Sequence, residues 1–358
     1  MKIKLIGEPR VVMSNPHSLF NYFAWPTVAR LQNGKIALVA SGFRLRHVCP
    51  FGKTVIAYSE NEGETYTAPA PVIDTVLDDR DGGILAFDES GVIVTSFNNT
   101  TAMQRGHRTA TPYSNAYLDI VPHEAEAKYL GSTFRISRDC GVTFGEIHKS
   151  PITSPHGPTQ LADGTILWVG RTYDTANEPD EIRAYTIDPE SGEMTLVGKV
   201  DPLPPEADTY ENCEPHAIQL PSGRIIAHIR VHTAKKVHEA LTIYQTESDD
   251  GGRTWTPPHA LLGRTGGAPP HILRHSSGAL ICTYACRAEP YTILAMISLD
   301  NGETWDTDHL LHTNGVNWDI GYPSTVELRD GSLLTAFYAH PTADDPAVIY
   351  QQKWQLDV

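Results

Sequence analysis

Two arginines stand at the ends of apolar strands, where a positive charge needs a partner. Arg230 follows the run Ile225–Ile229, and Arg287 follows the run Leu280–Cys286. A guanidinium group binds a carboxylate through two parallel hydrogen bonds, and burying it without such a partner is unfavourable. We interpret the partner as an anionic ligand. The alternative is an internal salt bridge, for example between Arg230 and Glu214.

The strands that carry these residues belong to a repeated unit. Each copy reads as a strand that ends in Leu-x-(Asp/Asn/Ser)-Gly, followed by a second apolar strand, and the glycine turn between them is typical of a β-hairpin. A period of about sixty residues indicates an array of similar sheets. The six copies are Pro26–Ile36, a looser Gly83–Ile93, Pro158–Ile166, Pro215–Ile225, Pro270–Leu280 and Pro323–Leu333.

A second pattern, Ser-x-(Asn/Asp)-x-Gly-x-Thr-aromatic, occurs four times, and we refer to it as the Asp box. Its Asp or Asn side chain can accept backbone N–H bonds, its glycine permits a positive φ, and its aromatic ring can pack under the turn. Four copies in one chain are a repeat of the fold and predict a turn on an outer hairpin. They are Ser59–Tyr66, Ser137–Phe144, Ser248–Trp255 and Ser298–Trp305.

Six units of four strands predict an all-β protein, a six-bladed β-propeller, with residues 1–358 as a single domain. The ends, Met1–Met13 and Ala347–Leu356, both alternate apolar and polar residues, as two strands that close one blade would. The alternative is a β-sandwich with accidental turn similarity. The longest irregular segments, Asn98–Glu126 and Asp201–Cys213, are expected to be loops over one face, where loops on a rigid scaffold carry function.

Composition narrows the choice of partners. The chain has 43 acidic and 28 basic residues and a net charge of −15, which disfavours nucleic acid and anionic membranes but permits a small anionic ligand in a local basic pocket. The N-terminus lacks the apolar core of a signal peptide, no transmembrane run is present, and the five cysteines are an odd number. We therefore expect reduced thiols and a cytoplasmic protein. We expect no metal and no cofactor, because no zinc or phosphate-loop motif is present, and the oligomeric state is left open.

Together, the Asp boxes and the six units resemble the sialidase (neuraminidase) superfamily over the whole chain. The resemblance implies four site residues at strand ends that meet on the propeller axis. Tyr322 is then the nucleophile, Glu214 the base that takes its proton, and Arg230 and Arg287 the clamp for a sugar carboxylate. They lie in the strings Asn212–His216, Ala227–His232, Tyr284–Glu289 and Gly321–Ser324.

This set of residue types suits an acidic sugar. Sialidases use a Tyr nucleophile in place of the usual second carboxylate, because a carboxylate would repel the carboxylate of the substrate. A phenol with a pKa near 10 is a poor nucleophile until a neighbouring base takes its proton. The alternative interpretations are a salt-bridged Glu214 at the rim and a Tyr322 that only packs at the start of its strand.

One departure from the sialidase pattern concerns charge. The first arginine of the family lies in a Phe-Arg-Ile-Pro element, and here that element reads Phe23–Pro26 with Ala24 at the position of the arginine. Arg44 or Arg46 is expected to replace the missing charge. N-acetylneuraminate glycosides are therefore expected to be poor substrates.

The other departure concerns the acid. The loop after the first hairpin, residues 42–51, carries an Asp in sialidases but has no carboxylate here. The nearest titratable candidate is His47. Asp79 or Asp81 of the second unit could also reach the site.

Several further residues are assigned by position. Arg171 follows a strand of the third unit and is expected to join the basic pocket. Trp25 and Trp318 form either a sugar-stacking platform or part of the core, and Asp319 is either a supporting partner of the site or a loop acid. The histidines beside the strand-start prolines are expected to cap backbone groups or face solvent rather than bind a metal; they are His156, His216 and His271.

The leading hypothesis is an exo-acting, retaining glycoside hydrolase of sialidase-like fold that releases a terminal acidic sugar. One alternative is a polysaccharide lyase for uronic acids, in which Tyr322 or a His removes the C5 proton and arginines neutralise the carboxylate. Another is a carbohydrate-binding propeller without activity. A lyase product gains a conjugated double bond and absorbs ultraviolet light, which distinguishes the two enzymes.

Overall fold

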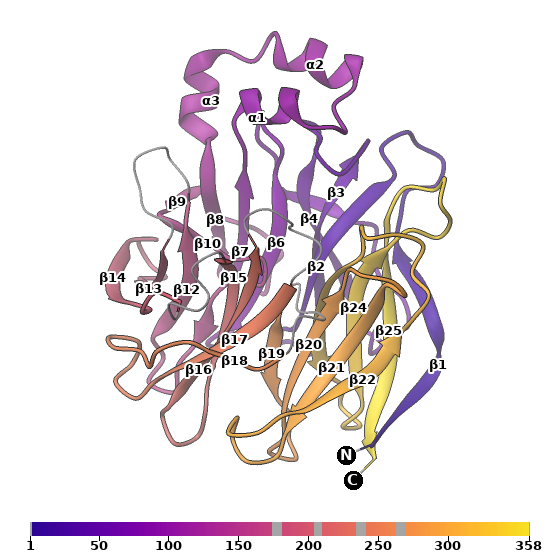
Figure 1. Cartoon of the computed structure of the whole chain (residues 1–358). Coiled ribbons are helices and arrows are strands. Elements are labelled where there is room, and N and C mark those ends of the chain that lie inside the picture. The colour runs from indigo at the N-terminus through magenta and orange to yellow at the C-terminus, as the bar shows by residue number, and fades with distance from the viewer. Residues whose placement is uncertain (1, 174–180, 204–209, 234–240, 263–268, 358) are drawn as a thin grey trace.

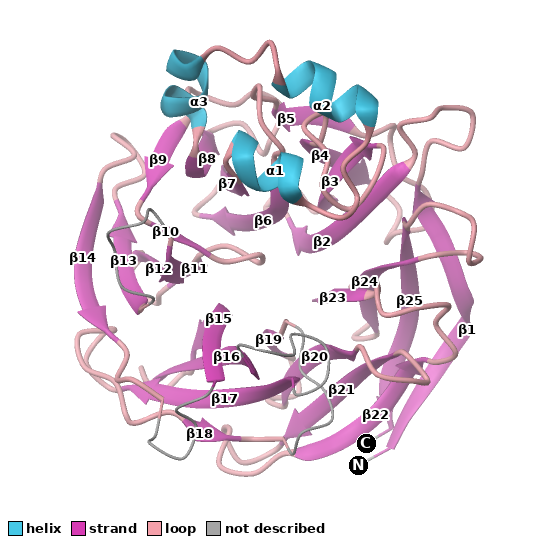
Figure 2. Cartoon of the chain, turned by 45° about the horizontal axis from the view of Figure 1, so that its top comes forward, coloured by secondary structure: helices cyan, strands magenta, loops and turns pink. Residues whose placement is uncertain are grey.

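In the computed structural model, six antiparallel sheets stand side by side in a ring (Figure 1, Figure 2). The structure describes residues 2–173, 181–203, 210–233, 241–262 and 269–357. Among these residues, five sheets have four strands, and one has five because two short strands share the innermost position. The predicted six-bladed β-propeller is therefore confirmed.

The blades are numbered I to VI by the order of their inner strands, and their strands are given from the axis outward. Blade I has β2 (Tyr22–Arg30), β3 (Ile36–Arg44), β4 (Lys53–Ser59) and β5 (Ala70–Ile73). Blade II has β6 (Arg80–Phe87), β7 (Gly91–Asn98), β8 (Gly131–Ser137) and β9 (His148–Ser150). Blade III has β10 (Ile152–Thr153) and β11 (Thr159–Gln160) innermost, then β12 (Ile166–Thr172), β13 (Ile182–Ile187) and β14 (Met194–Lys199). Blade IV has β15 (Tyr210–Gln219), β16 (Ile225–Thr233), β17 (Leu241–Ser248) and β18 (His259–Ala260). Blade V has β19 (His271–Arg274), β20 (Leu280–Cys286), β21 (Thr292–Ser298) and β22 (Asp306–His312). Blade VI has β23 (Gly321–Glu327), β24 (Leu333–Ala339), β25 (Val348–Asp357) and β1 (Lys2–Met13).

The two ends of the chain close blade VI, as their alternating pattern predicts. Strand β1 pairs antiparallel with β25, from Lys2 opposite Asp357 to Met13 opposite Ile349. Both termini lie at the same end of the molecule (Figure 1). Closure places the first strand on the outside of the last blade, so the ring leaves no sheet open at a seam.

The Asp boxes have the predicted internal bonds. In the copy of blade V, the amide of Gly302 donates to Ser298 Oγ at 2.8 Å, and the amide of Thr304 donates to Asp300 Oδ1 at 2.9 Å. All four boxes connect the third and fourth strands of a blade. The glycines of the four boxes have positive φ, from 76° to 89°.

The Asp boxes also join neighbouring blades, which the sequence pattern did not predict. Gly302 of blade V accepts a hydrogen bond from Gln245 of blade IV at 3.0 Å. The carbonyl of Gly63 in blade I accepts one from Gln351 of blade VI at 2.9 Å. Each of these turns therefore fixes its blade to the preceding one.

Four inner strands contain a bulge at the same place, and the bulged residue is not a glycine. Trp25, Asp81, Glu214 and Tyr322 have φ values of 56°, 49°, 50° and 50°, and the pairing register shifts at each of these positions. Side chains rarely adopt this left-handed backbone conformation. A bulge turns its side chain away from the normal alternation of the strand, so these four residues share one special orientation.

The residues that follow the bulges link the inner strands around the axis. His216 Nδ1 accepts the amide N–H of Ile272 at 3.1 Å, and Ser324 Oγ accepts that of Val28 at 3.1 Å. His271 makes the equivalent bond to blade VI. The three blade-start histidines are buried and do not face solvent. Of the two alternatives that the sequence left open, backbone capping is the one that His216 and His271 show.

The segment between β7 and β8 departs from the sequence prediction. Instead of a plain loop, it forms α1 (Thr101–Gly106), α2 (Pro112–Leu118) and α3 (His123–Tyr129), which lie over one face of the ring (Figure 2). A capping box at Thr111 and Ser114 starts α2. The second predicted loop, Asp201–Cys213, ends earlier than expected because β15 begins at Tyr210, and residues 204–209 lie outside the described part.

Among the described residues, no helix is long and apolar enough to cross a membrane. All five cysteines fall within the described ranges, and none is in a disulfide.

The contacts between blades predict different outcomes for two equivalent glycines. Gly252 and Gly302 both have a φ of 89°, but a Cβ added at Gly302 would come within 2.6 Å of the buried Ile226, against 3.4 Å from Leu167 at Gly252. We expect Gly302→Ala to lower the free energy of unfolding by about 1–3 kcal/mol more than Gly252→Ala, the usual range for an overpacked core. Urea unfolding of both variants measures this difference, and equal losses would contradict the role assigned to the blade IV–blade V contact.

Candidate active site

Two of the bulged residues meet at the propeller axis and carry the predicted pair. The Tyr322 hydroxyl donates a hydrogen bond to Glu214 Oε1 at 2.5 Å. Arg230, on β16, donates to the other oxygen of the same carboxylate, and its Nη1 lies 3.4 Å from the Tyr322 oxygen. The salt bridge between Glu214 and Arg230 that the sequence left open is therefore present, and the same carboxylate also accepts a bond from the tyrosine. The side chain of Glu214 is 20% exposed.

The electrostatics around this pair suit a base beside a neutral phenol. Burial alone would raise the pKa of Glu214, but the Arg230 guanidinium and the hydrogen bond from Tyr322 hold it below its ordinary value. Burial and the Glu214 carboxylate raise the pKa of Tyr322 well above its ordinary value. At neutral pH the resting site therefore contains a carboxylate that accepts from a protonated tyrosine.

A cavity of about 390 Å³ opens beside this pair, between blades II, III and IV. Asp81, Arg171, Glu214 and Arg230 line it. Arg171 therefore lines the same cavity as Arg230, together with two carboxyl groups. Tyr322 and Arg287 do not line the cavity, and Tyr322 contacts its wall through Glu214 and Arg230.

Asp81 is the acid candidate that reaches the cavity. Its Oδ1 is buried without a hydrogen-bond partner. Burial raises its pKa to about 7, assisted by the Glu214 carboxylate and opposed by the Arg80 guanidinium. The other candidate of this segment, Asp79, is fully buried and accepts bonds from Thr75 and Asn98, so it supports the loop and does not contact the cavity.

Arg287 approaches Tyr322 from blade V. Its guanidinium carbon lies 5.4 Å from the centre of the Tyr322 ring. Its Nε donates to the Ile320 carbonyl at 2.9 Å, and its Nη2 donates to the Tyr338 hydroxyl at 2.7 Å. The second predicted arginine of the clamp is therefore placed next to the tyrosine by two fixed bonds.

Two residues predicted to contact substrate are instead part of the packing. Trp25 is 1% exposed, and the guanidinium groups of Arg44 and Arg80 lie 4.8 and 4.2 Å from its ring centre. Its ring is therefore covered and does not form a stacking platform. Arg44 is fully buried and forms an ion pair with Asp78 at 2.5 Å, so it is not placed to replace the missing arginine.

Sequence reasoning missed Arg80. This residue opens β6, directly before Asp81, and its Nε is buried without a hydrogen-bond partner. Its Nη2 lies 3.4 Å from His47 Nε2, and its Nη1 lies 3.7 Å from Asp78. In the sequence, the run Asp78–Asp81 looks like a solvated acidic turn. The signal that could have identified Arg80 is its position, because a cation begins the strand that also carries Asp81.

Asp319 is a supporting partner of the site and not a loop acid. Its carboxylate accepts hydrogen bonds from Tyr22 at 2.8 Å and Tyr338 at 2.9 Å. It also lies 2.9 Å from His47 Nδ1 and 3.1 Å from His340 Nε2. Burial lowers the pKa of His47 to about 4 against the influence of Asp319, so His47 is a neutral ring held by a carboxylate and is poorly suited to act as an acid.

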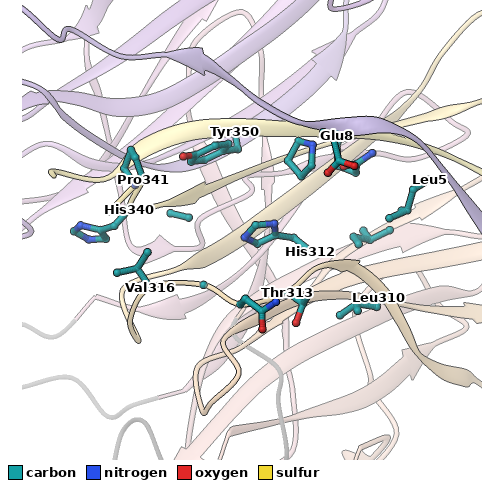
Figure 3. Close-up of a pocket in the computed structure, with 15 residues that line it drawn as sticks. Leu5, Glu8, Leu310, His312, Thr313, Val316, His340, Pro341 and Tyr350 are labelled. Carbon is teal, nitrogen blue, oxygen red and sulfur yellow. The ribbon is translucent and has the colours of Figure 1, made fainter. Parts of the chain in front are cut away.

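A second cavity of about 380 Å³ lies on the outside of blades V and VI (Figure 3). It opens where β1 leaves its pairing register between Ile6 and Arg10. His312, Tyr350 and His340 line it, and none of the site residues predicted from the sequence does. His340 connects this cavity to Asp319.

The ring of six blades, the Asp boxes and the axial Tyr–Glu–Arg cluster together define a sialidase-like propeller. The sequence profile described as the BNR repeat-like domain matches residues 116–335, and the chain belongs to this family.

Comparison with solved structures supports the same fold. A protein of unknown function from Dyadobacter fermentans is 19% identical over 99% of each chain, with a TM-score of 0.77. The intramolecular trans-sialidase from Ruminococcus gnavus is 13% identical over 94% of this chain and 95% of that chain, with a TM-score of 0.63. The α-L-arabinanase from Penicillium chrysogenum is 13% identical over 98% and 97%, with a TM-score of 0.60. Among curated proteins, none matches this chain in sequence.

The raised pKa of Asp81 predicts a dependence of stability on pH. Its folded-state pKa of about 7 lies above the value near 4 of an unfolded chain, so the contribution of this group falls as pH rises from about 4 to about 7. Asp81→Asn avoids that loss. Relative to the wild type, its stability is expected to rise by about 3 kcal/mol between about pH 4.5 and about pH 8.

Denaturant unfolding of wild type and Asp81→Asn at both pH values measures this difference. Asp344→Asn serves as the control, because Asp344 is exposed. A difference between wild type and Asp81→Asn that does not change with pH would show that the folded protein does not hold this proton.

Proposed function

We propose that this protein is a retaining, exo-acting glycoside hydrolase that releases a terminal acidic sugar. The observation that carries the proposal is the hydrogen bond from Tyr322 to Glu214 beside Arg230. A tyrosine becomes a nucleophile when an adjacent base takes its proton, and this pair has the required contact. The bulges that turn both side chains toward the axis keep them in place.

The first step forms a bond between the Tyr322 oxygen and the anomeric carbon of the sugar. Glu214 takes the phenolic proton, the bond from the anomeric carbon to the leaving oxygen breaks, and an acid protonates that oxygen. In the second step, water attacks the same carbon and the bond to Tyr322 breaks, with Glu214 returning its proton to the phenolic oxygen. Two displacements at one carbon retain the configuration.

Asp81 is the residue that we assign as the acid. It lines the same cavity as Glu214, and with a pKa of about 7 roughly half of it is protonated at neutral pH and most of it in mildly acidic solution. Two carboxyl groups with pKa values displaced in opposite directions are the arrangement that acid–base pairs in enzymes use. In the second step, the Asp81 carboxylate takes the proton of the attacking water.

The arginines support an acidic substrate. Arg171 and Arg230 line the cavity and Arg287 lies next to Tyr322, in a chain whose net charge is −15. A local group of cations in an acidic protein indicates a binding site for an anion. A cavity of about 390 Å³ suits one terminal sugar better than a polymer that lies across the face, which supports exo action. The trans-sialidase and arabinanase that share the fold support a carbohydrate ligand.

The uronic-acid lyase is the remaining alternative within enzymes, because it would use the same tyrosine and arginines. Its product absorbs ultraviolet light, and no water is consumed. A hydrolase releases a reducing sugar without that absorbance. Product analysis on any substrate that is turned over therefore separates the two reactions.

Replacement of the nucleophile is the direct test. Tyr322→Phe keeps the ring and removes the attacking oxygen. Turnover is expected to fall by several orders of magnitude, whereas stability is expected to change by about 1 kcal/mol, the scale of one hydrogen bond. Activity is measured on aryl glycosides of N-acetylneuraminate, glucuronate and galacturonate, and stability by thermal melting.

The matched control is Tyr284→Phe, which removes a buried hydroxyl that bonds Asp308 on blade V. It is expected to keep full activity. Undiminished turnover by Tyr322→Phe on any of these glycosides would rule out the assigned nucleophile.

A further inference from the structure

We infer that Asp319 is a positioning residue that orients two arginines. It acts on Arg287 through Tyr338 and on Arg80 through His47. Arg80 is thereby a third arm of the clamp for the carboxylate of the sugar. This inference rests on the proposed function, and it assigns the specificity for acidic over neutral sugars to one buried carboxylate.

The first relay runs through Tyr338. The Tyr338 hydroxyl donates to Asp319 Oδ1 at 2.9 Å and accepts from Arg287 Nη2 at 2.7 Å. A hydroxyl has a single hydrogen to donate. Because an ionised carboxylate can only accept, the hydrogen of Tyr338 is directed to Asp319 and its lone pair to Arg287. The position of the guanidinium group is therefore set by the carboxylate behind it.

The second relay runs through His47. Its Nδ1 lies 2.9 Å from Asp319 Oδ1, so Nδ1 carries the hydrogen and donates it. The ring is neutral because burial lowers its pKa to about 4. Its Nε2 is then an acceptor, and it lies 3.4 Å from Arg80 Nη2. Asp319 thus fixes the tautomer that can accept from Arg80.

The centre of these relays is a buried, ionised group. Asp319 is 7% exposed, and Tyr22 and His340 donate to it in addition to the two relays. Burial alone would raise its pKa, but the hydrogen bonds from His47 and His340 and the Arg287 guanidinium hold the pKa well below its usual range. The carboxylate is therefore charged at neutral pH, where it can only accept hydrogen bonds.

Arg80 has the features of a ligand-binding cation. Its Nε is a buried donor without a partner, and it is 8% exposed, close to the 6% of Arg287. Its guanidinium group lies against Trp25, whose ring is 6.3 Å from that of Tyr322. Trp25 directly follows Ala24, which stands where the resemblance places the missing arginine. The blade II arginine therefore lies against the residue next to that position.

The experiment separates positioning from folding by comparing acidic and neutral ligands. The probes are the methyl glycosides of N-acetylneuraminate, glucuronate and galacturonate, each with its uncharged carboxamide, and binding is measured by calorimetry. Tyr338→Phe removes the link to Arg287, and His47→Phe removes the link to Arg80. Each is expected to weaken binding of the acid by about tenfold, the effect of a lost bond to a charged group, and to change binding of the carboxamide by less than about twofold.

Three further variants complete the test. Asp319→Asn is expected to weaken acid binding more than either relay variant, and Arg80→Met at least as much as His47→Phe. Tyr284→Phe is the matched control, because it also removes a buried tyrosine hydroxyl, but one that bonds Asp308 of blade V and not Asp319. It is expected to leave the ratio of acid to carboxamide affinity unchanged, and melting curves verify that each variant is folded.

The outcomes are distinguishable from those that test the hydrolase. The inference would be overturned by a wild type that binds acid and carboxamide equally, or by relay variants that weaken both equally or neither. A Tyr284→Phe effect as large as those of the relay variants would also overturn it. Acid-selective binding that follows the relays in a protein that hydrolyses none of the glycosides would uphold the inference and reject only the proposed reaction.

Discussion

The candidate site depends on a backbone constraint, the left-handed bulge at the start of four inner strands. Trp25, Asp81, Glu214 and Tyr322 hold φ values near 50°, which a side chain adopts at a free-energy cost of about 1–3 kcal/mol each. Such strain persists only where the surrounding structure fixes it, and here the ring of blades does so through bonds between inner strands. In return, side chains from blades I, II, IV and VI, which are far apart in the sequence, converge on one axis.

Convergence alone does not define chemistry; the charges around the bulged residues do. Glu214 shares its carboxylate between Arg230 and Tyr322 and stays ionised, whereas Asp81 has an unpartnered oxygen and a pKa raised to about 7. Two carboxyl groups in one cavity thus receive opposite pKa shifts, from a guanidinium partner in one case and from burial in the other. Behind them, Asp319 fixes the arginines without contact with the cavity. The site therefore has an inner layer that can react and an outer layer that orients.

The sequence predicted the fold because the fold is a repeat, and six glycine turns with four Asp boxes leave little freedom. It also predicted the Tyr322–Glu214 pair, since both residues precede a strand-start proline in a recognisable string. It did not predict that the side chains of Trp25 on β2 and Arg44 on β3 would pack against each other inside the core, because such contacts between side chains of two strands leave no spacing pattern. Arg80 was missed for a related reason, since it stands in an acidic run and its contacts with Trp25 and His47 form only across blades. The three short helices were missed because none is long enough to show periodicity.

The central claim is a covalent bond between Tyr322 and the anomeric carbon. It is tested most directly by mass spectrometry after incubation with an acidic glycosyl fluoride that carries a second fluorine beside the anomeric carbon, which slows release of the intermediate. The account predicts a protein whose mass increases by one sugar, with the label on the peptide that contains Tyr322. A label on Glu214 or Asp81, or steady turnover of the same sugar without any labelled protein, would contradict it.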